Sequence, residues 1–439
     1  MLKIGFILPS SEYLFDPFRG DPHTHFQILT VLESHFGNKV ELCLPDLRGI
    51  KKEFAIYHIP ECDIYLHSVY TLDYNEQVSI VKNLRKRYPK AKHIAGGPHV
   101  TVFKEECLKI FDSLILGDGE ELIIKSVNDF LDNNLKKIYY QETPIDINIY
   151  PYPKRKWLPN STVSHPGLIS LKNKKGYENL LSTTVIFSRG CSHKCAFCYM
   201  PEVEKYRPGP RLRFRKPELI EEEIEYLKKD YNIKAISLLD EIGFPPNQRK
   251  AIPHIEAIGK TGIIWKTQGR AESVTGEIAK LLHDAGCVIM CLGAESVSQH
   301  SLDIIDKKIC VEQTKNAVKL LKKNDIEVRL YMILGLPAEP EYIVEQTWSF
   351  IKETDPDMVY LSILTLRPGT EMYSNPQKYG FRWVNTDWNK TMHLFSRYKD
   401  EIPNLTFEYE KYKGFTNEQI INNYLELQKR IIENGYGPR

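Results

Sequence analysis

The sequence predicts an α/β protein in two parts: a doubly wound parallel sheet, then a partial barrel of six β/α units and a mainly helical tail. Short apolar runs alternate with helical patterns over the first ~140 residues and again from about 183 to 375. The chain of 439 residues is too long for a single compact core, and 42% hydrophobic residues suffice for two. We expect the sheet domain over residues 1–140, a linker over 141–182, the barrel over 183–375 and a helical C-terminal region over 376–439.

Strand and helix patterns of the first part follow one another as βαβ units do. Apolar residues recur at helical spacing in FQILTVLESHF and VSIVKNLRKRY, between short β-like runs. Ligands of such a sheet bind at the carboxyl ends of its strands. The predicted strands are KIGFIL, VELCL, CDIYLH, KHIAG and SLIL, which end near Leu8, Leu44, His67, Gly96 and Leu116.

A polar and proline-rich linker precedes the second alternation, which has six strands. Helical segments follow the strands, and PELIEEEIEYLKK begins with Pro217 at a position that suits a first turn. Eight units are required to close a full barrel, so six units predict an open one. The predicted strands are TTVIFS, IKAISLLD, GIIWKTQ, CVIMCLG, IEVRLYMILG and MVYLSILTL.

Charge and hydropathy exclude several classes of protein. The net charge is +2, and no apolar run approaches the roughly 18 residues of a membrane span. The apolar run in the opening MLKIGFILPSSEYLF is too short for the core of a signal peptide. Nine cysteines at irregular spacing do not form a disulfide framework. We therefore expect a cytoplasmic protein that binds neither membranes nor nucleic acids.

Three cysteines gather in FSRGCSHKCAFCYMP, with the spacing Cys-x3-Cys-x2-Cys, directly after the first strand of the barrel. Barrels place catalytic residues at this end of their strands. Zinc bound by Cys191, Cys195, Cys198 and His193 is one alternative, but structural zinc sites usually combine two separated pairs. A four-iron cluster normally takes four thiolates. Three thiolates would leave one iron open for a small ligand.

This cysteine spacing resembles the radical S-adenosylmethionine (SAM) superfamily, which carries it on the first loop of a partial (β/α)6 barrel. The resemblance implies a [4Fe-4S] cluster on Cys191, Cys195 and Cys198, and SAM chelated to the open iron and cleaved to a deoxyadenosyl radical. It also implies SAM contacts from the aromatic residue after the last cysteine and from later strand ends. Taken singly, each of these segments is equally compatible with an ordinary turn, a salt bridge or a loop aromatic. The expected SAM contacts are Tyr199, Asp240, Glu241, Arg270, Glu295, Ser296, Gly335 and Leu366.

Glycines follow two strands of the first part, in AGGPHVT and ILGDGEE, and allow close approach of a large ligand. The G-x-G-x-x-G fingerprint of dinucleotide sites is absent. With the cysteine loop behind them, these segments resemble the cobalamin-binding class of radical SAM enzymes over about residues 1–375. The Asp-x-His-x-x-Gly cobalt-ligating motif is missing, since DPHTHF lacks the glycine. The resemblance implies cobalamin contacts from Ser68, Tyr70, Thr71, Gly96, Gly97, Pro98, His99, Gly117, Gly119 and Glu120.

The resemblance implies methylation of an unactivated carbon in a small-molecule or peptide substrate, with electrons from a flavodoxin- or ferredoxin-like donor. A rearrangement or cyclisation without methyl transfer stays open, as does a sensor that binds the cofactors without catalysis. No catalytic residue is assigned. Cys287 and Cys291 lie four apart on one predicted strand, which places them on one face as buried hydrophobes or as hydrogen-atom donors. The aromatic segment WVNTDWNKTMHLFSRY of the tail is expected to cover the substrate or simply to pack in the core.

Overall fold

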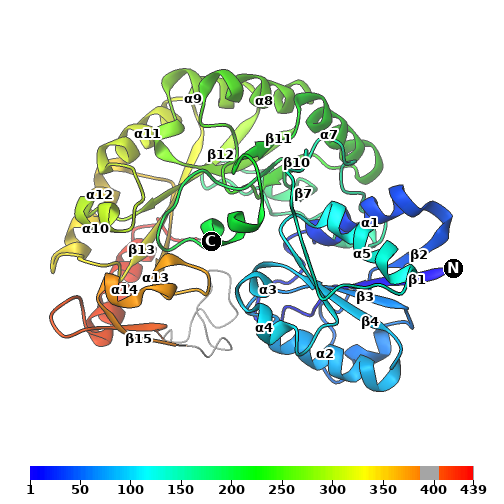
Figure 1. Ribbon diagram of the computed structural model, residues 1–439. Helices are drawn as coiled ribbons and strands as arrows, with labels where there is room; N and C mark the ends of the chain where they lie inside the picture. Colours follow the sequence, from blue (N-terminus) through cyan, green and yellow to red (C-terminus); the bar gives the residue numbers. More distant parts are fainter. Residues whose placement is uncertain (386–404, 439) are drawn as a thin grey trace. The chain divides into compact units, whose positions relative to one another are not determined.

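The computed structural model of the chain describes residues 1–385 and 405–438 (Figure 1). These residues form two compact units. The first contains Met1–Val163 together with Met200–Arg211, and the second contains Ser164–Tyr199 together with residues 212–385 and 405–438. The expected linker is thus shared between the units, and a short segment after the cysteine loop belongs to the first unit.

A six-stranded parallel sheet forms the first unit, in the order β2-β1-β3-β4-β5-β6. Its last strand pairs in parallel with β5 and was not predicted, because IYY is too short to show a periodicity. Helices α1 and α5 pack together, where Ile28 meets the backbone of Gly119. The strands are β1 (Leu2–Ile7), β2 (Val40–Cys43), β3 (Ile64–Ser68), β4 (Lys92–Gly96), β5 (Ser113–Leu116) and β6 (Ile138–Tyr140), and the helices are α1 (His23–Phe36), α2 (Tyr74–Arg87), α3 (Pro98–Val102), α4 (Lys104–Cys107), α5 (Gly119–Leu131) and α6 (Met200–Val203).

A second six-stranded parallel sheet, in the order β14-β13-β12-β11-β10-β7, confirms the predicted open barrel. The strands β7 and β14 are its two edges, so the sheet is not closed, and its helices line the outer side of the arc (Figure 1). Pro217 begins α7, as its position in the sequence predicts. The strands are β7 (Ser182–Val185), β10 (Ala235–Leu238), β11 (Ile264–Gly269), β12 (Cys287–Glu295), β13 (Glu327–Leu334) and β14 (Met358–Ile363), and the helices are α7 (Pro217–Tyr231), α8 (Gln248–Lys260), α9 (Gly276–Asp284), α10 (Gln299–Ile304), α11 (Val311–Lys323), α12 (Ile343–Thr354) and α13 (Glu371–Ser374).

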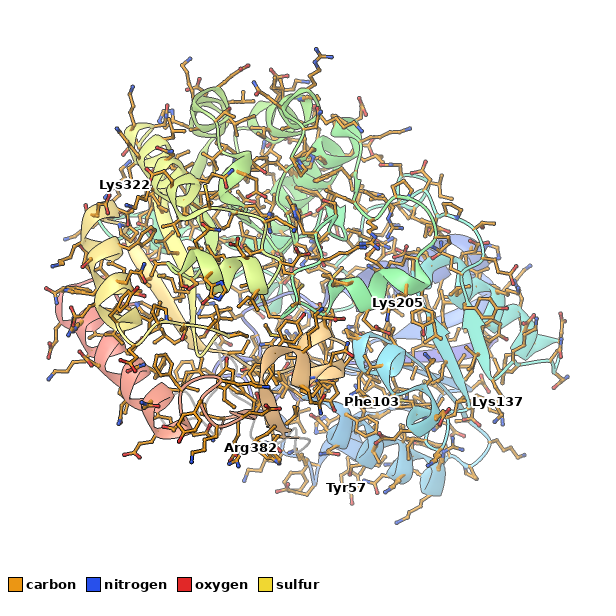
Figure 2. All side chains as sticks on the ribbon, turned by 60° about the vertical axis from the view of Figure 1, so that its left-hand side comes forward. Tyr57, Phe103, Lys137, Lys205, Lys322 and Arg382 are labelled. Atoms are coloured by element: carbon orange, nitrogen blue, oxygen red, sulfur yellow. The ribbon has the colours of Figure 1, made fainter. Side chains whose placement is uncertain are left out.

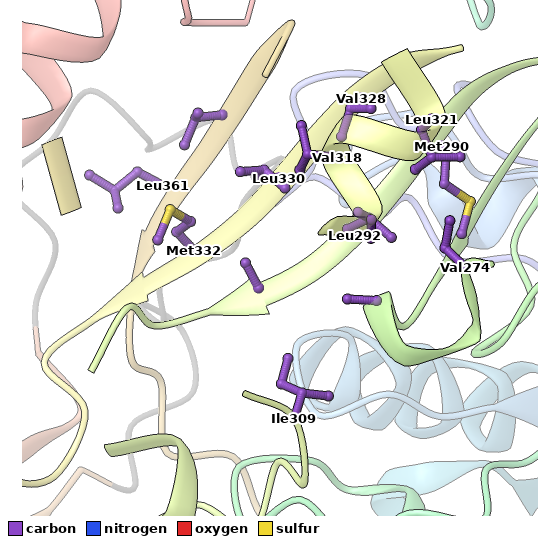
Figure 3. Close-up of a cluster of buried hydrophobic side chains, with 14 of the residues drawn as sticks. Val274, Met290, Leu292, Ile309, Val318, Leu321, Val328, Leu330, Met332 and Leu361 are labelled. Carbon is purple, nitrogen blue, oxygen red and sulfur yellow. The ribbon is translucent and has the colours of Figure 1, made fainter. Parts of the chain in front are cut away.

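The main hydrophobic core of the second unit lies between its sheet and these helices. Alternate residues of the strands supply it, as Met290 and Leu292 of β12 do opposite Leu321 of α11 (Figure 3). Trp265 of β11 is fully buried, and its indole N–H donates to the Ala285 carbonyl at 2.8 Å. The residues between these core positions therefore face the opposite side of the sheet, the interior of the barrel.

Helix α14 (Asn417–Glu433) confirms the helical C-terminal region and packs on β14 and α12. The amide of Val359 in β14 donates to the Tyr436 carbonyl at 2.8 Å. A small antiparallel pair, β15 (Phe381–Val384) and β16 (Phe407–Tyr409), was not predicted. Of the aromatic tail segment, residues 386–398 lie outside the described part, so its expected covering role is not addressed. A second antiparallel pair joins β8 (Ser188–Arg189) and β9 (Arg213–Phe214).

Charged side chains such as Lys137 and Lys322 lie on the outside of the protein (Figure 2). In the described part of the chain, no helix combines the length and apolar character that crossing a membrane requires.

Candidate active site

The three-cysteine loop follows β7 and is fixed to the second unit by backbone hydrogen bonds. Phe187 N–H donates to Asp240 Oδ1 at 3.0 Å. Ala196 N–H donates to the Ile305 carbonyl at 2.8 Å, and the Ala196 carbonyl accepts from Met372 N–H at 3.1 Å. The partner residues follow three different strands, β10, β12 and β14. The carboxyl end of the whole sheet therefore positions the loop.

The three thiols lie in different environments. Cys195 is 7% exposed, whereas Cys191 and Cys198 are half-buried. Arg270 Nη1 donates to Cys195 Sγ at 3.7 Å. Burial raises the pKa of the Cys191 thiol, while a backbone hydrogen bond from His193 and the charge of Arg270 lower it. Bound iron would supply the positive charge that these sulfurs need, so the donor set fits an iron–sulfur cluster.

The zinc alternative gains no support from the arrangement of these side chains. Among the described residues, no three His, Cys, Asp or Glu side chains lie close enough together to share one metal ion. His193 instead points its Nε2 toward Glu272 Oε1, 3.8 Å away, and burial lowers the pKa of its ring. A four-iron cluster binds each thiolate at a different iron, so its cysteines need not converge on one point.

Arg270 and Glu295, two expected SAM contacts, belong to one buried network. The Arg270 guanidinium donates to the Glu272 carboxylate and to the Lys307 carbonyl. The ammonium group of Lys307 in turn donates to Glu295 Oε1 at 2.7 Å, and both of these side chains are at most 10% exposed. Sequence reasoning missed Lys307 and Glu272, because a lone lysine in the loop after α10 carries no recognisable spacing.

Asp240 and Glu241 follow β10 but differ in their surroundings. Asp240 is 1% exposed, and its Oδ2 has no hydrogen-bond partner among the described residues. Burial raises the pKa of Asp240 to about 8. Glu241 is exposed. Asp240 therefore contacts the start of the cysteine loop through its bond to the Phe187 amide. The sequence pattern did not predict this contact.

Side chains bond the backbone groups of two of the remaining expected SAM contacts, Gly335 and Leu366. Gly335 N–H donates to Glu339 Oε2 at 2.9 Å, and its carbonyl accepts from Tyr409 Oη at 2.9 Å. Leu366 N–H donates to Thr406 Oγ1 at 2.9 Å. Burial raises the pKa of Glu339 to about 8. Ser296 is buried, with its Oγ accepting from Ser298 N–H at 3.1 Å, and Tyr199 is half-buried in the loop.

Cys287 and Cys291 do not share a face of β12, contrary to the strand alternation. The pairing of β11 with β12 skips Val288, since Trp265 faces Cys287 and Lys266 faces Ile289. This bulge reverses the alternation. Cys287 packs in the core beneath the helices, whereas Cys291 lies on the barrel side.

In the first unit, the expected cobalamin contacts lie at the carboxyl ends of three adjacent strands, β3, β4 and β5. His99 Nδ1 and Thr71 Oγ1 are 3.2 Å apart, and the His99 ring stacks on Tyr74 with centroids 4.2 Å apart. Burial lowers the pKa of His99 to about 4. Tyr70 is 46% exposed. Of the other expected contacts, Ser68 and Glu120 are buried. Gly96 and Pro98 are half-buried at the end of β4.

Three glycines at this edge lie close against other parts of the chain, and their expected contact with a ligand stays a prediction. A Cβ on Gly97 would lie 2.8 Å from the Val69 carbonyl oxygen, and Gly97 has φ of +107°. A Cβ on Gly119 would lie 2.9 Å from Ile28. The space beside Gly117 is filled by the Tyr206 carbonyl, and the next residue, Arg207, forms a 3.2 Å ion pair with Asp118.

The same edge nevertheless carries buried polar atoms that the described chain leaves unpaired. They are Asp73 Oδ1 after β3 and His99 Nε2 after β4. Asp73 is 4% exposed and His99 1%. Buried polar atoms in proteins are almost always hydrogen-bonded. A ligand rich in amide groups, such as a corrin, fits these atoms.

Comparison with known proteins agrees with this geometry. The profile of the Radical SAM superfamily matches residues 185–351. An uncharacterized methyltransferase of Pyrococcus horikoshii is 30% identical over 346 residues, which are 76% of this chain and 72% of that protein.

Two solved structures share the fold at low sequence identity. The radical SAM methyltransferase TsrM of Kitasatospora setae, with cobalamin and a [4Fe-4S] cluster bound, is 16% identical with a TM-score of 0.65, over 85% of this chain and 77% of that one. The cobalamin-dependent SAM radical enzyme OxsB, with aqua-cobalamin and SAM bound, is 16% identical with a TM-score of 0.72, over 99% of this chain and 67% of that one. These structures confirm the predicted order of a doubly wound sheet and an open barrel.

Proposed function

The chain belongs to the radical SAM superfamily, and we propose that it is a cobalamin-dependent methyltransferase acting on an unactivated carbon of a small molecule or peptide. The observation that carries this proposal is the anchored loop of Cys191, Cys195 and Cys198, with the Arg270 guanidinium on the Cys195 sulfur. The similarity to a methyltransferase of Pyrococcus horikoshii supports it.

We assign a [4Fe-4S] cluster to the three cysteines and SAM to the strand ends around them. When bound, this pair supplies a carbon-centred radical by one-electron cleavage of SAM. Arg270 disperses the negative charge of Cys195, and Lys307 holds Glu295 in place. With a pKa of about 8, Asp240 is largely uncharged at neutral pH and adds no negative charge beneath the loop. The proposed SAM contacts remain Tyr199, Asp240, Glu241, Arg270, Glu295, Ser296, Gly335 and Leu366.

We assign cobalamin to the carboxyl edge of the first sheet, where it would supply the methyl group. His99 Nε2 and Asp73 Oδ1 are buried groups available to hydrogen-bond its amides. Tyr70 offers an exposed aromatic surface. Thr71 orients the His99 ring through their 3.2 Å contact. The other proposed contacts are Ser68, Gly96, Gly97, Pro98, Gly117, Gly119 and Glu120.

We place the reaction in the cytoplasm, with a flavodoxin- or ferredoxin-like protein as the electron donor. A one-electron donor is needed because SAM cleavage consumes an electron that the substrate does not supply.

Cofactor content after anaerobic purification from cells supplied with cobalamin tests the proposal. We expect near-stoichiometric corrin in the visible spectrum and about four irons per chain. The C195A variant should lose iron, while C310A, which removes an exposed cysteine, should keep it. A full cluster without any corrin would contradict the cobalamin assignment.

Reaction products then separate methyl transfer from rearrangement. With trideuteromethyl-SAM and candidate substrates, a methyltransferase forms S-adenosylhomocysteine, 5′-deoxyadenosine and a product that carries the label. A cyclase or rearrangement enzyme forms 5′-deoxyadenosine without S-adenosylhomocysteine, and a sensor forms neither.

A further inference from the structure

The interior of the second unit has a closed floor at the amino ends of its strands. Lys266 Nζ donates to the Leu168 carbonyl at 2.6 Å. Arg329 and Glu327 form a 2.7 Å ion pair that is at most 7% exposed. Glu327 also accepts from Lys172 N–H at 2.6 Å. The segment 168–172 thus covers the interior at the amino ends of the strands. Charged side chains of the strands that face the interior hold it there.

A layer of oxidisable side chains lies directly above this floor. Tyr331 and Tyr360 are neighbours on β13 and β14, with ring centroids 5.2 Å apart and an interplanar angle of 22°. Tyr331 hydrogen-bonds the buried thiol of Cys291, which the bulge in β12 turns toward this side. Burial raises the pKa of both Tyr331 and Cys291. Both groups therefore keep their hydrogen at neutral pH.

The interior is accessible at the carboxyl end. Ile186 is 37% exposed and Leu239 is 46% exposed, and they follow the neighbouring core residues Val185 and Leu238. By alternation they face the side of the sheet opposite the helices. Both phenol rings are also only half-buried. A group generated at the cysteine loop, which leaves the same end of the sheet, can approach this layer, whereas the floor blocks the other end.

We propose that this layer, defined as Cys291, Tyr331 and Tyr360, is the exchangeable hydrogen-atom donor of the barrel. It would quench a carbon-centred radical when no substrate carbon is in place. The inference rests on the proposed function, because that function supplies the radical. It adds a role for side chains that methyl transfer does not use.

The proposed step balances as a hydrogen-atom transfer. The phenol O–H bond of Tyr331 breaks, a C–H bond forms on the radical carbon, and a phenoxyl radical remains. Cys291 then gives its S–H hydrogen to the phenoxyl oxygen, which restores Tyr331 and leaves a thiyl radical. One electron from the external one-electron donor and one proton from solvent return the thiol. A purely structural layer would need only the shapes of these side chains, not their O–H and S–H groups.

Deuterium transfer from solvent tests this role. The cluster-loaded chain is incubated with SAM and dithionite in D2O without substrate, and 5′-deoxyadenosine is analysed by mass spectrometry. We expect mostly monodeuterated product from the wild type and a several-fold lower deuterium fraction from Y331F and C291A. Y226F removes a phenol on the helix side of the sheet, which bonds Tyr231, and should leave the fraction unchanged.

Each outcome has a distinct meaning. Unlabelled 5′-deoxyadenosine from the wild type, or a deuterium fraction that both variants leave unchanged, overturns the inference alone. Absence of 5′-deoxyadenosine despite a full cluster overturns the proposed function and the inference with it. The cofactor-free chain gives an independent readout. Y331F removes the hydroxyl bond that lowers the pKa of the Cys291 thiol, so it should slow alkylation of Cys291 by iodoacetamide several-fold in peptide mapping. An unchanged alkylation rate in folded Y331F contradicts the contact on which the relay depends.

Discussion

The carboxyl ends of the two sheets differ in how their polar groups are satisfied. In the second unit, Arg270, Lys307 and Glu295 already pair with one another beside the cysteine loop, although Asp240 Oδ2 has no partner among the described residues. In the first unit, Asp73 and His99 each leave a buried polar atom without a partner in the described chain, and no such pairing of charged side chains joins them. A site that its own side chains preorganise can be recognised by a short motif. A site that is completed by a large ligand is spread over several loops, and no short motif marks it.

The largest effect should come from the cysteine loop itself. Replacing Cys191, Cys195 or Cys198 by Ala is expected to abolish 5′-deoxyadenosine formation, because no spare thiol lies on the loop. Iron and sulfide analysis with product quantification measures this. The buried Cys107 of the first unit is the matched control, and C107A should retain the cluster with only a packing loss. Activity and iron retained in C198A would refute the cluster assignment.

Arg270 tests whether the network around the loop matters beyond the ligands. R270A is expected to lower cluster occupancy or activity by about 10–100-fold, as loss of an outer-sphere partner typically does. R270K should recover part of this, because it restores the charge but not the fork of donors. Iron per chain and the reduction potential of the cluster are the measurements. Equal iron content and potential in R270A and the wild type would show that the contact is incidental.

Acid should weaken the first unit through a buried imidazole pair. His67 Nε2 lies 3.1 Å from His93 Nδ1, and burial lowers their pKa values to about 4 and about 2. The unfolded chain therefore binds more protons below about pH 6.5, and stability falls as the pH drops from there toward 4.

For His67 this loss is about 3 kcal/mol. Hydrogen exchange followed by mass spectrometry, read separately for the two units across this pH range, measures it. H67Q should flatten the acid dependence, and H35Q, at an exposed position, should not. Identical acid profiles for wild type and H67Q would contradict the assignment.

The unpaired nitrogen of His99 tests the corrin edge. H99F keeps an aromatic ring against Tyr74 but removes Nε2, and it should weaken cobalamin binding by about 1–3 kcal/mol without changing iron content. Corrin titration followed by visible absorbance measures this. T71V removes the partner of Nδ1 and spares Nε2, so it is the matched control. A T71V effect as large as that of H99F would point to ring orientation rather than to a bond with the ligand.

Much of the fold followed from periodicity, and its exceptions have physical causes. Six barrel strands were predicted because each is a continuous apolar run, whereas the three residues of β6 show no pattern. The face of β12 on which Cys287 lies was mispredicted, because the alternation of residues within one strand does not reveal a bulge in its pairing with the next strand. Lys307 was missed because its partner, Glu295, lies twelve residues away across α10. Gly97 and Gly117 were expected to admit a ligand, which stays a prediction; the groups that lie against them in the chain itself are the backbones of Val69 and Tyr206.

The smallest expected effect concerns Asp240, which joins the cysteine loop to β10. Its pKa is raised to about 8 by burial, so the folded chain binds more protons than the unfolded chain above pH 4. The wild type should therefore lose stability as the pH rises from about 4 to 8, the opposite sign to the histidine pair. D240N keeps an oxygen for Phe187 N–H but cannot ionise, and between pH 7 and 8 it should gain about 1 kcal/mol on the wild type. Urea unfolding at both pH values measures this difference, and E256Q, at an exposed position of α8, should show none. A constant difference between D240N and the wild type would mean that Asp240 ionises normally, and that the loop is held over a charged carboxylate.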